Sequence, residues 1–288
     1  MVQAWVIIFA VTLIWGSSFL LLKKALIVFS PDQVVAGRMS IAGLVFLPYA
    51  IRHFRRVPGR LWGRLFLFAL IANIGTSLSY ALAQSGMDSS LNGILNTLSP
   101  LMTLLVGIIF FRQKARWLQT IGIGIGLLGA AVLIFLQQDG KIGMINLFAI
   151  FSVLATFGNG WMNNLLKFQL SELKPLEVAA FTFLITLIPA LVYWFASGAM
   201  PLVTSHESGL QALIFIAMLA ILSNGLALLL IARLVQLSSP VFASLTTYLI
   251  PIVALAWGVW DGEHIWLAEI LAMFLISFSV YLVNRDSR

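Results

Sequence analysis

Residues 112–136 read RQKARWLQTIGIGIGLLGAAVLIFL: a basic cluster followed by twenty residues without a charge. A helix needs about 20 mostly apolar residues to cross the hydrocarbon core of a bilayer. A strand of a membrane barrel needs only about ten, with an alternating hydrophobicity that this stretch lacks. The stretch therefore predicts a membrane-spanning helix that follows a basic loop.

The same pattern recurs along the whole chain. Of its 288 residues, 61% are hydrophobic and only 9% are charged, whereas a soluble domain carries about 25% charged residues. The mean hydropathy of +1.02 also favours lipid as the solvent. We expect an all-α membrane protein with ten transmembrane helices, near residues 3–22, 33–51, 62–83, 91–111, 117–136, 144–166, 176–196, 210–232, 240–260 and 266–283.

Composition argues against several other classes of protein. The chain has no cysteine, which excludes disulfides and cysteine metal sites. Its net charge of +7 does not indicate nucleic acid, because the basic residues fall in short loops between apolar runs. Residues 1–22 lack the basic leader of a signal peptide, so we expect a first membrane helix there. No metal and no cofactor are expected.

The loop charges predict an orientation. With the N-terminus inside the cell, thirteen basic residues fall on the inner side and only Lys23, Lys24 and Lys141 fall in outer loops. Because basic residues are retained on the cytoplasmic side, this asymmetry predicts that both termini lie inside. The Lys23–Lys24 pair is the exception to this pattern.

The chain also repeats itself. Pro100 in the fourth span is followed seven residues later by Gly107, and Pro251 in the ninth is followed seven later by Gly258. Ser89–Ser90 and Ser238–Ser239 precede these two spans. Five spans per half is an odd number, so we expect two inverted five-helix repeats, residues 1–138 and 139–288. Inverted halves are common in transporters that hold their substrate near the membrane midplane.

Four stretches carry a family resemblance: Leu13-Ile14-Trp15-Gly16-Ser17-Ser18-Phe19, Pro31 with Arg38 and Pro48, Leu98-Ser99-Pro100-Leu101, and Trp257-Gly258-Val259-Trp260-Asp261-Gly262-Glu263. In this order they resemble EamA-type members of the drug/metabolite transporter superfamily. The resemblance implies ten helices around a central cavity, and an inner-membrane transporter of amino acids, other metabolites or drugs. One departure is Phe111-Arg112-Gln113, where the first repeat usually has a Gly-Glu ending like that at Glu263.

Polar side chains line up on one face of several spans, where they are expensive unless they have a use. Aromatic rings among them suit stacking on an aromatic or cationic ligand. The predicted substrate-binding residues are Trp15, Ser18, Asn73, Ser77, Tyr80, Asn92, Asn96, Asn159, Trp161, Asn163, Ser244 and Tyr248. Two alternatives remain: hydroxyls and amides also join neighbouring helices, and Trp and Tyr also mark the membrane interface.

Four further residues are predicted to serve gating or coupling. Pro100 and Pro251 free backbone carbonyls within their spans and are candidate hinges. Glu263 is the best candidate for a proton site, although no acidic residue lies at the centre of a span. Arg38 is expected to form an ion pair at the outer rim, with Asp32, Asp88 or Glu263, in preference to capturing a substrate carboxylate.

These features predict a secondary transporter of small organic molecules that works by alternating access. An exporter of amino acids, possibly aromatic ones, fits the neutral polar faces best. Alternatives are efflux of drugs or cations, uptake of a vitamin, a structural membrane subunit, or an enzyme at the membrane interface. The spans contain no recognised catalytic motif. The expected partners are a small-molecule substrate and membrane lipid, and the protein is a monomer or a homodimer.

Overall fold

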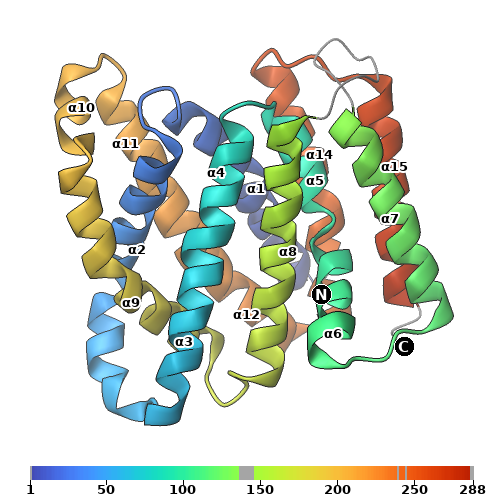
Figure 1. Ribbon diagram of the computed structural model, residues 1–288, viewed down its shortest axis with the longest axis horizontal. Helices are drawn as coiled ribbons and strands as arrows, with labels where there is room; N and C mark the ends of the chain where they lie inside the picture. Colours follow the sequence, from blue (N-terminus) through green and yellow to red (C-terminus); the bar gives the residue numbers. More distant parts are fainter. Residues whose placement is uncertain (1, 136–145, 239, 244, 286–288) are drawn as a thin grey trace.

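A computed structural model describes residues 2–135, 146–238, 240–243 and 245–285 of the chain. Within these ranges the protein consists of helices joined by short connections and contains no strand. Each of the ten predicted spans corresponds to a helix or to a short series of stacked helical segments (Figure 1). The predicted all-α membrane fold is thus confirmed.

The ten spans have the following bounds. The first five are α1 (Val2–Ala25), α2 (Pro31–His53), α3–η3–α4 (Trp62–Phe68, Ala69–Thr76, Ser77–Gln84), α5–α6 (Ser89–Asn96, Ser99–Phe111) and α7 (Trp117–Phe135). The second five are α8 (Leu147–Phe168), α9 (Pro175–Ala196), α11–η4–α12 (Gly209–Met218, Leu219–Leu226, Ala227–Leu237), α13–α14 (Pro240–Ala243, Leu245–Trp260) and α15 (Leu267–Arg285). Short helices η1 (Phe54–Arg56), η2 (Gly59–Leu61) and α10 (Ala199–Ser205) lie in connections.

Six spans of the described chain are long and apolar enough to cross a membrane alone, and α5–α6 is a seventh that is bent by 43°. The bend lies just before Pro100, which begins α6 and has no N–H to continue the preceding helix. Pro251, the other predicted hinge, lies inside an unbroken α14. Helix α8 has ample length but carries Asn159, Asn163 and Asn164, and α14 and α15 are shorter apolar helices.

The third and eighth spans share a feature that the sequence analysis did not predict. Their central segments, η3 and η4, are π-helical over eight residues each. Each segment contains an asparagine, Asn73 or Asn224, and a glycine, Gly75 or Gly225, which weakens the regular helix. Because π-helical turns often occur at functional sites, these two segments make the middle of the bundle a candidate functional region.

The two halves of the chain contact each other reciprocally. Helix α1 packs against α11, α12 and α14 of the second half, and α8 packs against η3, α4, α5 and α6 of the first. Helix α2 packs against α9 at one side of the bundle, and α7 packs against α15 at the other (Figure 1). The contacts pair spans of one half with spans of the other, while the inverted relation of the two halves stays a prediction.

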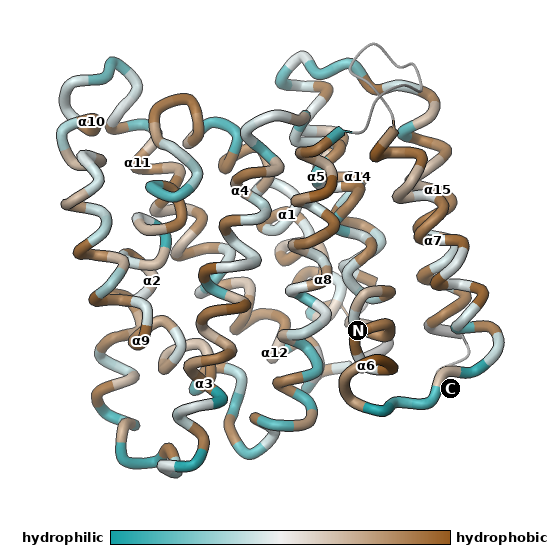
Figure 2. Tube along the Cα trace, in the orientation of Figure 1, coloured by the Kyte–Doolittle hydropathy of each residue, from teal (hydrophilic) through white to brown (hydrophobic). Residues whose placement is uncertain are grey.

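Glycines allow the α7–α15 contact to be close. A Cβ added at Gly122 would lie 2.7 Å from a Val283 methyl, and one at Gly129 would lie 2.7 Å from Ile276. Hydrophilic connections lie at both ends of the bundle, with apolar helix between them (Figure 2). We call the end with loops 54–61, 112–116 and 169–174 the basic face, and the opposite end the latch face.

Candidate functional site

A ring of uncharged polar groups joins the third, fourth and sixth spans near the middle of the bundle. The Tyr80 hydroxyl donates to Asn96 Oδ1 at 2.6 Å. The Asn159 amide donates to the Tyr80 hydroxyl at 3.0 Å and to Ser99 Oγ at 3.1 Å. These side chains come from α4, α5, α8 and α6, and each is only partly buried. We call Tyr80, Asn96, Ser99 and Asn159 the polar ring.

A second polar cluster joins α1 to the π segment η4. The Trp15 indole N–H donates to the Ser223 carbonyl oxygen at 3.3 Å, and the Ser18 and Ser223 hydroxyls are 2.5 Å apart. On the next residue, Asn224 Oδ1 accepts from Arg38 Nη2 at 2.6 Å. Helices α1 and α2 of the first half therefore meet the middle of the eighth span through polar groups.

An apolar layer connects the two clusters. Phe19, Ile250 and Ala254 form a small buried group against which both Trp15 and Tyr80 pack. The Phe19 and Tyr80 rings meet edge to face with centroids 6.1 Å apart. The predicted aromatic residues Trp15 and Tyr80 thus share one apolar surface, with polar partners on either side of it.

The other asparagines and the serine predicted for this site occupy different environments. Asn92 is fully buried; it donates to Gln84 Oε1 at 3.0 Å and accepts from Ser152 at 2.7 Å, so it joins three helices. Asn163 is exposed and donates to Thr103 Oγ1 at 3.1 Å. Asn73 is buried in η3, and its Nδ2 has no partner within the ranges that the structure describes. Ser77 begins α4 and is partly buried.

The remaining aromatic candidates pack against apolar side chains. Trp161 packs against Phe110, with ring centroids 4.5 Å apart, and against Phe157. Its buried Nε1 has no hydrogen-bond partner among the described residues. Tyr248 packs against the apolar core that contains α5 and α15 residues. Ser244 lies outside the described residues.

The expected ion pair of Arg38 does not form in the described structure. Asp32 accepts a hydrogen bond from Tyr193, and Glu263 pairs with Lys23. Arg38 reaches along the bundle to Asn224 instead. The prediction failed because the π segment of the eighth span, far away in sequence, lies beside α2 and offers an amide oxygen deeper than the rim.

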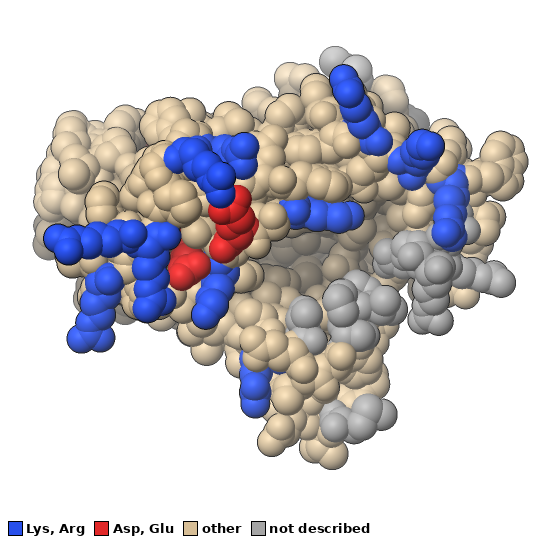
Figure 3. Space-filling model, turned by 90° about the horizontal axis from the view of Figure 1, so that it is seen from below, with Lys and Arg blue, Asp and Glu red and all other residues tan. Residues whose placement is uncertain are grey.

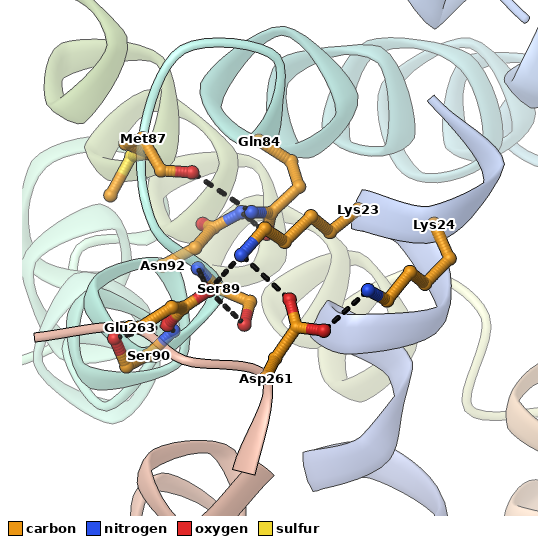
Figure 4. Close-up of polar contacts among 9 residues, drawn as sticks. All are labelled: Lys23, Lys24, Gln84, Met87, Ser89, Ser90, Asn92, Asp261 and Glu263. Carbon is orange, nitrogen blue, oxygen red and sulfur yellow. Dashed lines mark hydrogen bonds and ion pairs between the residues drawn. The ribbon is translucent and has the colours of Figure 1, made fainter. Parts of the chain in front are cut away.

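Glu263 forms a dense network at the latch face (Figure 4). Its two carboxylate oxygens accept hydrogen bonds from the backbone N–H and hydroxyl groups of both Ser89 and Ser90, at 2.7–3.0 Å. Lys23 Nζ lies 2.7 Å from Glu263 and 2.9 Å from Asp261, and Lys24 also pairs with Asp261. We call Lys23, Ser89, Ser90, Asp261 and Glu263 the latch.

The latch ties together the ends of three spans. Lys23 lies in the last turn of α1, the two serines begin α5, and Glu263 follows α14. A carboxylate at the start of α5 also complements the positive end of that helix. The latch accounts for the Lys23–Lys24 exception among the loop charges, because both cations are matched by carboxylates.

The carboxylates of the latch are held in their charged forms. Burial of Glu263 opposes ionisation, but hydrogen bonds from Lys23, Ser90 and Ser89 outweigh it and hold the pKa of Glu263 below its ordinary value. Burial likewise opposes ionisation of Asp261, while Lys23 and Lys24 lower its pKa on balance. Asp88, beside them, has a raised pKa because of burial and the nearby charge of Glu263.

The first half has a neutral counterpart of Glu263. The Gln113 N–H donates to the Gly107 carbonyl oxygen, as the Glu263 N–H donates to the Gly258 carbonyl oxygen. The Gln113 side chain donates to Asn164 Oδ1 at 2.5 Å and has no charge. The end of the fourth span is therefore joined to α8 by a hydrogen bond between two amides. The end of the ninth span is joined to α1 by an ion pair instead.

Glycines let α14 pack closely on helices α5 and α1 of the first half. A Cβ on Gly93 would lie 2.4 Å from Ala254 Cβ, and one on Gly16 would lie 2.6 Å from Val253 Cβ. Helix α14 is thus wedged against both α5 and α1. The opposite face is rich in lysine and arginine and shows a recess near its middle (Figure 3).

Sequence reasoning missed Ser223 and Asn224. They lie in a span of high hydropathy, and their contacts to Trp15, Ser18 and Arg38 come from residues 186 to 208 positions away. The signal available in the sequence is the Ser-Asn-Gly triplet inside an otherwise apolar run. Among the described residues, no group of three or more His, Cys, Asp or Glu side chains is placed to hold a metal ion.

Comparison with known proteins gives a consistent picture. A model of the "EamA-like transporter family" matches residues 3–135 and 146–285. The uncharacterized inner membrane transporter YedA of Escherichia coli K12 is 23% identical over 96% of this chain and 89% of its own. An S-adenosylmethionine/S-adenosylhomocysteine transporter of Chlamydia muridarum is 26% identical over a stretch that covers 88% of this chain and 82% of the relative. A solved structure titled "Crystal structure of protein" covers all of this chain and 99% of its own, with a TM-score of 0.61 at 17% identity.

Proposed function

This chain belongs to the EamA-like transporter family, and we propose that this inner-membrane transporter exports amino acids, aromatic ones among them, by alternating access. The polar ring is the observation that carries the proposal. Tyr80, Asn96, Ser99 and Asn159 present hydroxyl and amide groups beside an apolar layer with Trp15. A few polar groups among apolar and aromatic ones suit a small, partly apolar solute.

The chemistry of a relative's cargo supports the same class. The Chlamydia relative is named for S-adenosylmethionine and S-adenosylhomocysteine, and both of these molecules contain an amino-acid group. Amide and hydroxyl groups such as those of Asn96 and Asn159 can both donate and accept. They are therefore able to bind the polar groups of a small solute, whether these donate or accept, without carrying a charge of their own.

The described state suits loading from the cytoplasm. We propose that the basic face is cytoplasmic, because lysine and arginine are retained on that side of a membrane. That face shows a recess (Figure 3), while the latch and the Gly93–Ala254 contact join the helices at the other end. In the next step of the cycle, α14 would separate from α1 and α5 and release the solute outside.

The mode of energy coupling follows from the same clusters. Neither the polar ring nor the Trp15–Ser18–Ser223 cluster contains a carboxylate or a histidine. Proton-driven carriers normally hold such a group within the membrane. We therefore propose facilitated diffusion or exchange, with the solute gradient setting the direction of net flux.

The proposal is tested first by a thermal-shift screen of the purified protein against the twenty L-amino acids, nucleosides, vitamins and cationic dyes. Ligands that bind the folded state raise the melting temperature by mass action. Stabilisation by amino acids, followed by their counterflow in proteoliposomes, would support the proposal. Stabilisation by dyes alone, or no flux of any amino acid that binds, would contradict it.

A further inference from the structure

Arg38 lies inside the bundle with unused hydrogen-bonding capacity. Its Nη2 donates to Asn224 Oδ1 at 2.6 Å, while its enclosed Nε has no partner among the described residues. Nδ2 of Asn224 is likewise buried, with no acceptor in the described part of the chain. The residue as a whole remains partly accessible. Each of the two residues joined by this hydrogen bond thus keeps one N–H donor without an acceptor among the described residues.

The charge of Arg38 is not neutralised within the described protein. No carboxylate of the described residues lies within 4 Å of it, since the ion pairs there involve Lys23, Lys24 and Arg60. Asp32, on the same helix, accepts from Tyr193. A cation inside a membrane costs several kcal/mol unless it has a partner, and such residues commonly mark substrate pathways.

The second half of the chain provides a natural comparison for this position. Helix α9 begins with Pro175 as α2 begins with Pro31, and the third residue of each helix caps its own N-terminus. Helix α9 packs against η3, which contains Asn73, as α2 packs against η4, which contains Asn224. Seven residues after its proline, α2 has Arg38 where α9 has Thr182.

Thr182 shows that this helix contact needs no cation. Its hydroxyl donates to the Ala179 carbonyl oxygen of its own helix at 3.1 Å, and the residue is buried. The same packing of a proline-initiated helix against a π segment is thus achieved with a small neutral side chain. A structural role alone therefore does not explain the guanidinium of Arg38.

We propose that Arg38 and Asn224 form an anion subsite that binds the carboxylate of the transported solute. The inference rests on the proposed function and specifies how that solute is recognised. A guanidinium presents its N–H groups in a planar fork that matches a carboxylate. Asn224 Oδ1 orients the fork, and Asn224 Nδ2 supplies a further donor to the same anion.

The neighbouring residues place the rest of the solute. Ser223, adjacent to Asn224, contacts Trp15 and Ser18. Trp15 in turn packs on the apolar layer that it shares with Tyr80. A solute held by its carboxylate at Arg38 would therefore extend its side chain along Trp15 towards the polar ring. The subsite selects acids and zwitterions and disfavours simple cations.

The test compares ligands that differ in one group. Binding of L-phenylalanine, L-phenylalaninamide, 3-phenylpropanoate and phenethylamine is measured calorimetrically on the purified full-length protein. The wild type is expected to bind the two carboxylates at least about tenfold more tightly than the amide and the amine, because a hydrogen-bonded charge is being removed. Arg38→Thr, which installs the residue of the other half, is expected to abolish this preference.

Two variants make the result specific. Arg38→Lys keeps the charge but lacks the fork, so an intermediate preference is expected. Thr182→Ala alters the matching position of α9 and should leave the preference unchanged. Equal binding of acid and amide by the wild type and by Arg38→Thr would overturn the subsite while leaving amino-acid transport intact. Absence of binding by both carboxylates would also overturn it, and failure of the whole amino-acid screen would reject the proposed function itself.

Discussion

Single residues decide the strength of the latch, and Glu263 is the clearest case. Its pKa is held below the ordinary value of about 4.3. A carboxylate whose pKa is lowered by folding stabilises the protein above its unfolded pKa, and this contribution is lost as the pH falls through the folded pKa. The latch should therefore be intact at pH 7 and weaken below about pH 4.3.

Glu263→Gln tests this expectation. The amide lacks the charge and one of the acceptor positions, so we expect a loss of stability on the order of 2 kcal/mol at pH 7. The melting temperatures of wild type and variant should converge as the pH is lowered from 7 to 3.5. Glu207→Gln, in an exposed loop, should melt like the wild type throughout. A constant difference at every pH would show that the carboxylate charge is not what matters.

The Tyr80 hydroxyl is the hub of the polar ring. It donates to Asn96 and accepts from Asn159, so Tyr80→Phe leaves two amides short of a partner. We expect a fall in transport of roughly tenfold, since an unsatisfied polar group costs about 1–3 kcal/mol. The measurement is initial flux in proteoliposomes. Tyr281→Phe, at an exposed position on α15, should transport normally; equal rates for both variants would exclude the ring from the path.

At the scale of helices, α14 closes the latch face by packing on glycines. Gly93→Ala places a methyl 2.4 Å from Ala254 Cβ, and such overpacking costs about 1–3 kcal/mol. The closed state should lose population, so a cysteine at Ser18 should react faster with a membrane-impermeant thiol reagent added on the latch side. Flux measured in parallel reports whether the shifted state still completes the cycle.

Complementary variants identify the contact. Adding Ala254→Gly to Gly93→Ala restores the space, so labelling at Ser18 should return to the slow rate. Gly124→Ala in α7 is the matched control, because a Cβ there has no atom within 4 Å. If the double variant labelled as fast as Gly93→Ala alone, the α5–α14 contact would not be the closing element.

Helices were predictable where the cause is local. Long apolar runs and basic loops located all ten spans, and Pro31 and Pro175 begin helices as their fixed backbone favours. The π segments were not predictable, because η3 and η4 pack against helices that are distant in the sequence. The same holds for the site. Tyr80, Asn96 and Asn159 were predicted from the sequence, but Asn224 was not, because its contact with Arg38 depends on α2 lying beside it.

At the scale of the molecule, the two halves differ in charge where they correspond in position. Glu263 closes one end with ions, while Gln113 at the corresponding place forms only an amide contact. Arg38 in α2 corresponds to Thr182 in α9. We infer that the two ends of the transport cycle are not energetically equivalent, and that the state closed at the latch face is the more stable one. Glu263→Gln should reduce this difference, measured as faster labelling of a cysteine at Ser18 from the latch side, because it removes the charge that holds the latch.

The orientation of the whole molecule decides which side of the membrane the latch faces. The chain has no cysteine, so a single introduced cysteine labels without background. Gly59 lies in a basic-face loop where a side chain meets no atom within 4 Å, and His206 is exposed at the latch face. In intact cells, a membrane-impermeant maleimide should label His206→Cys and spare Gly59→Cys, whereas both should react after permeabilisation. The reverse pattern would place the latch in the cytoplasm and turn the proposed exporter into a protein loaded from outside.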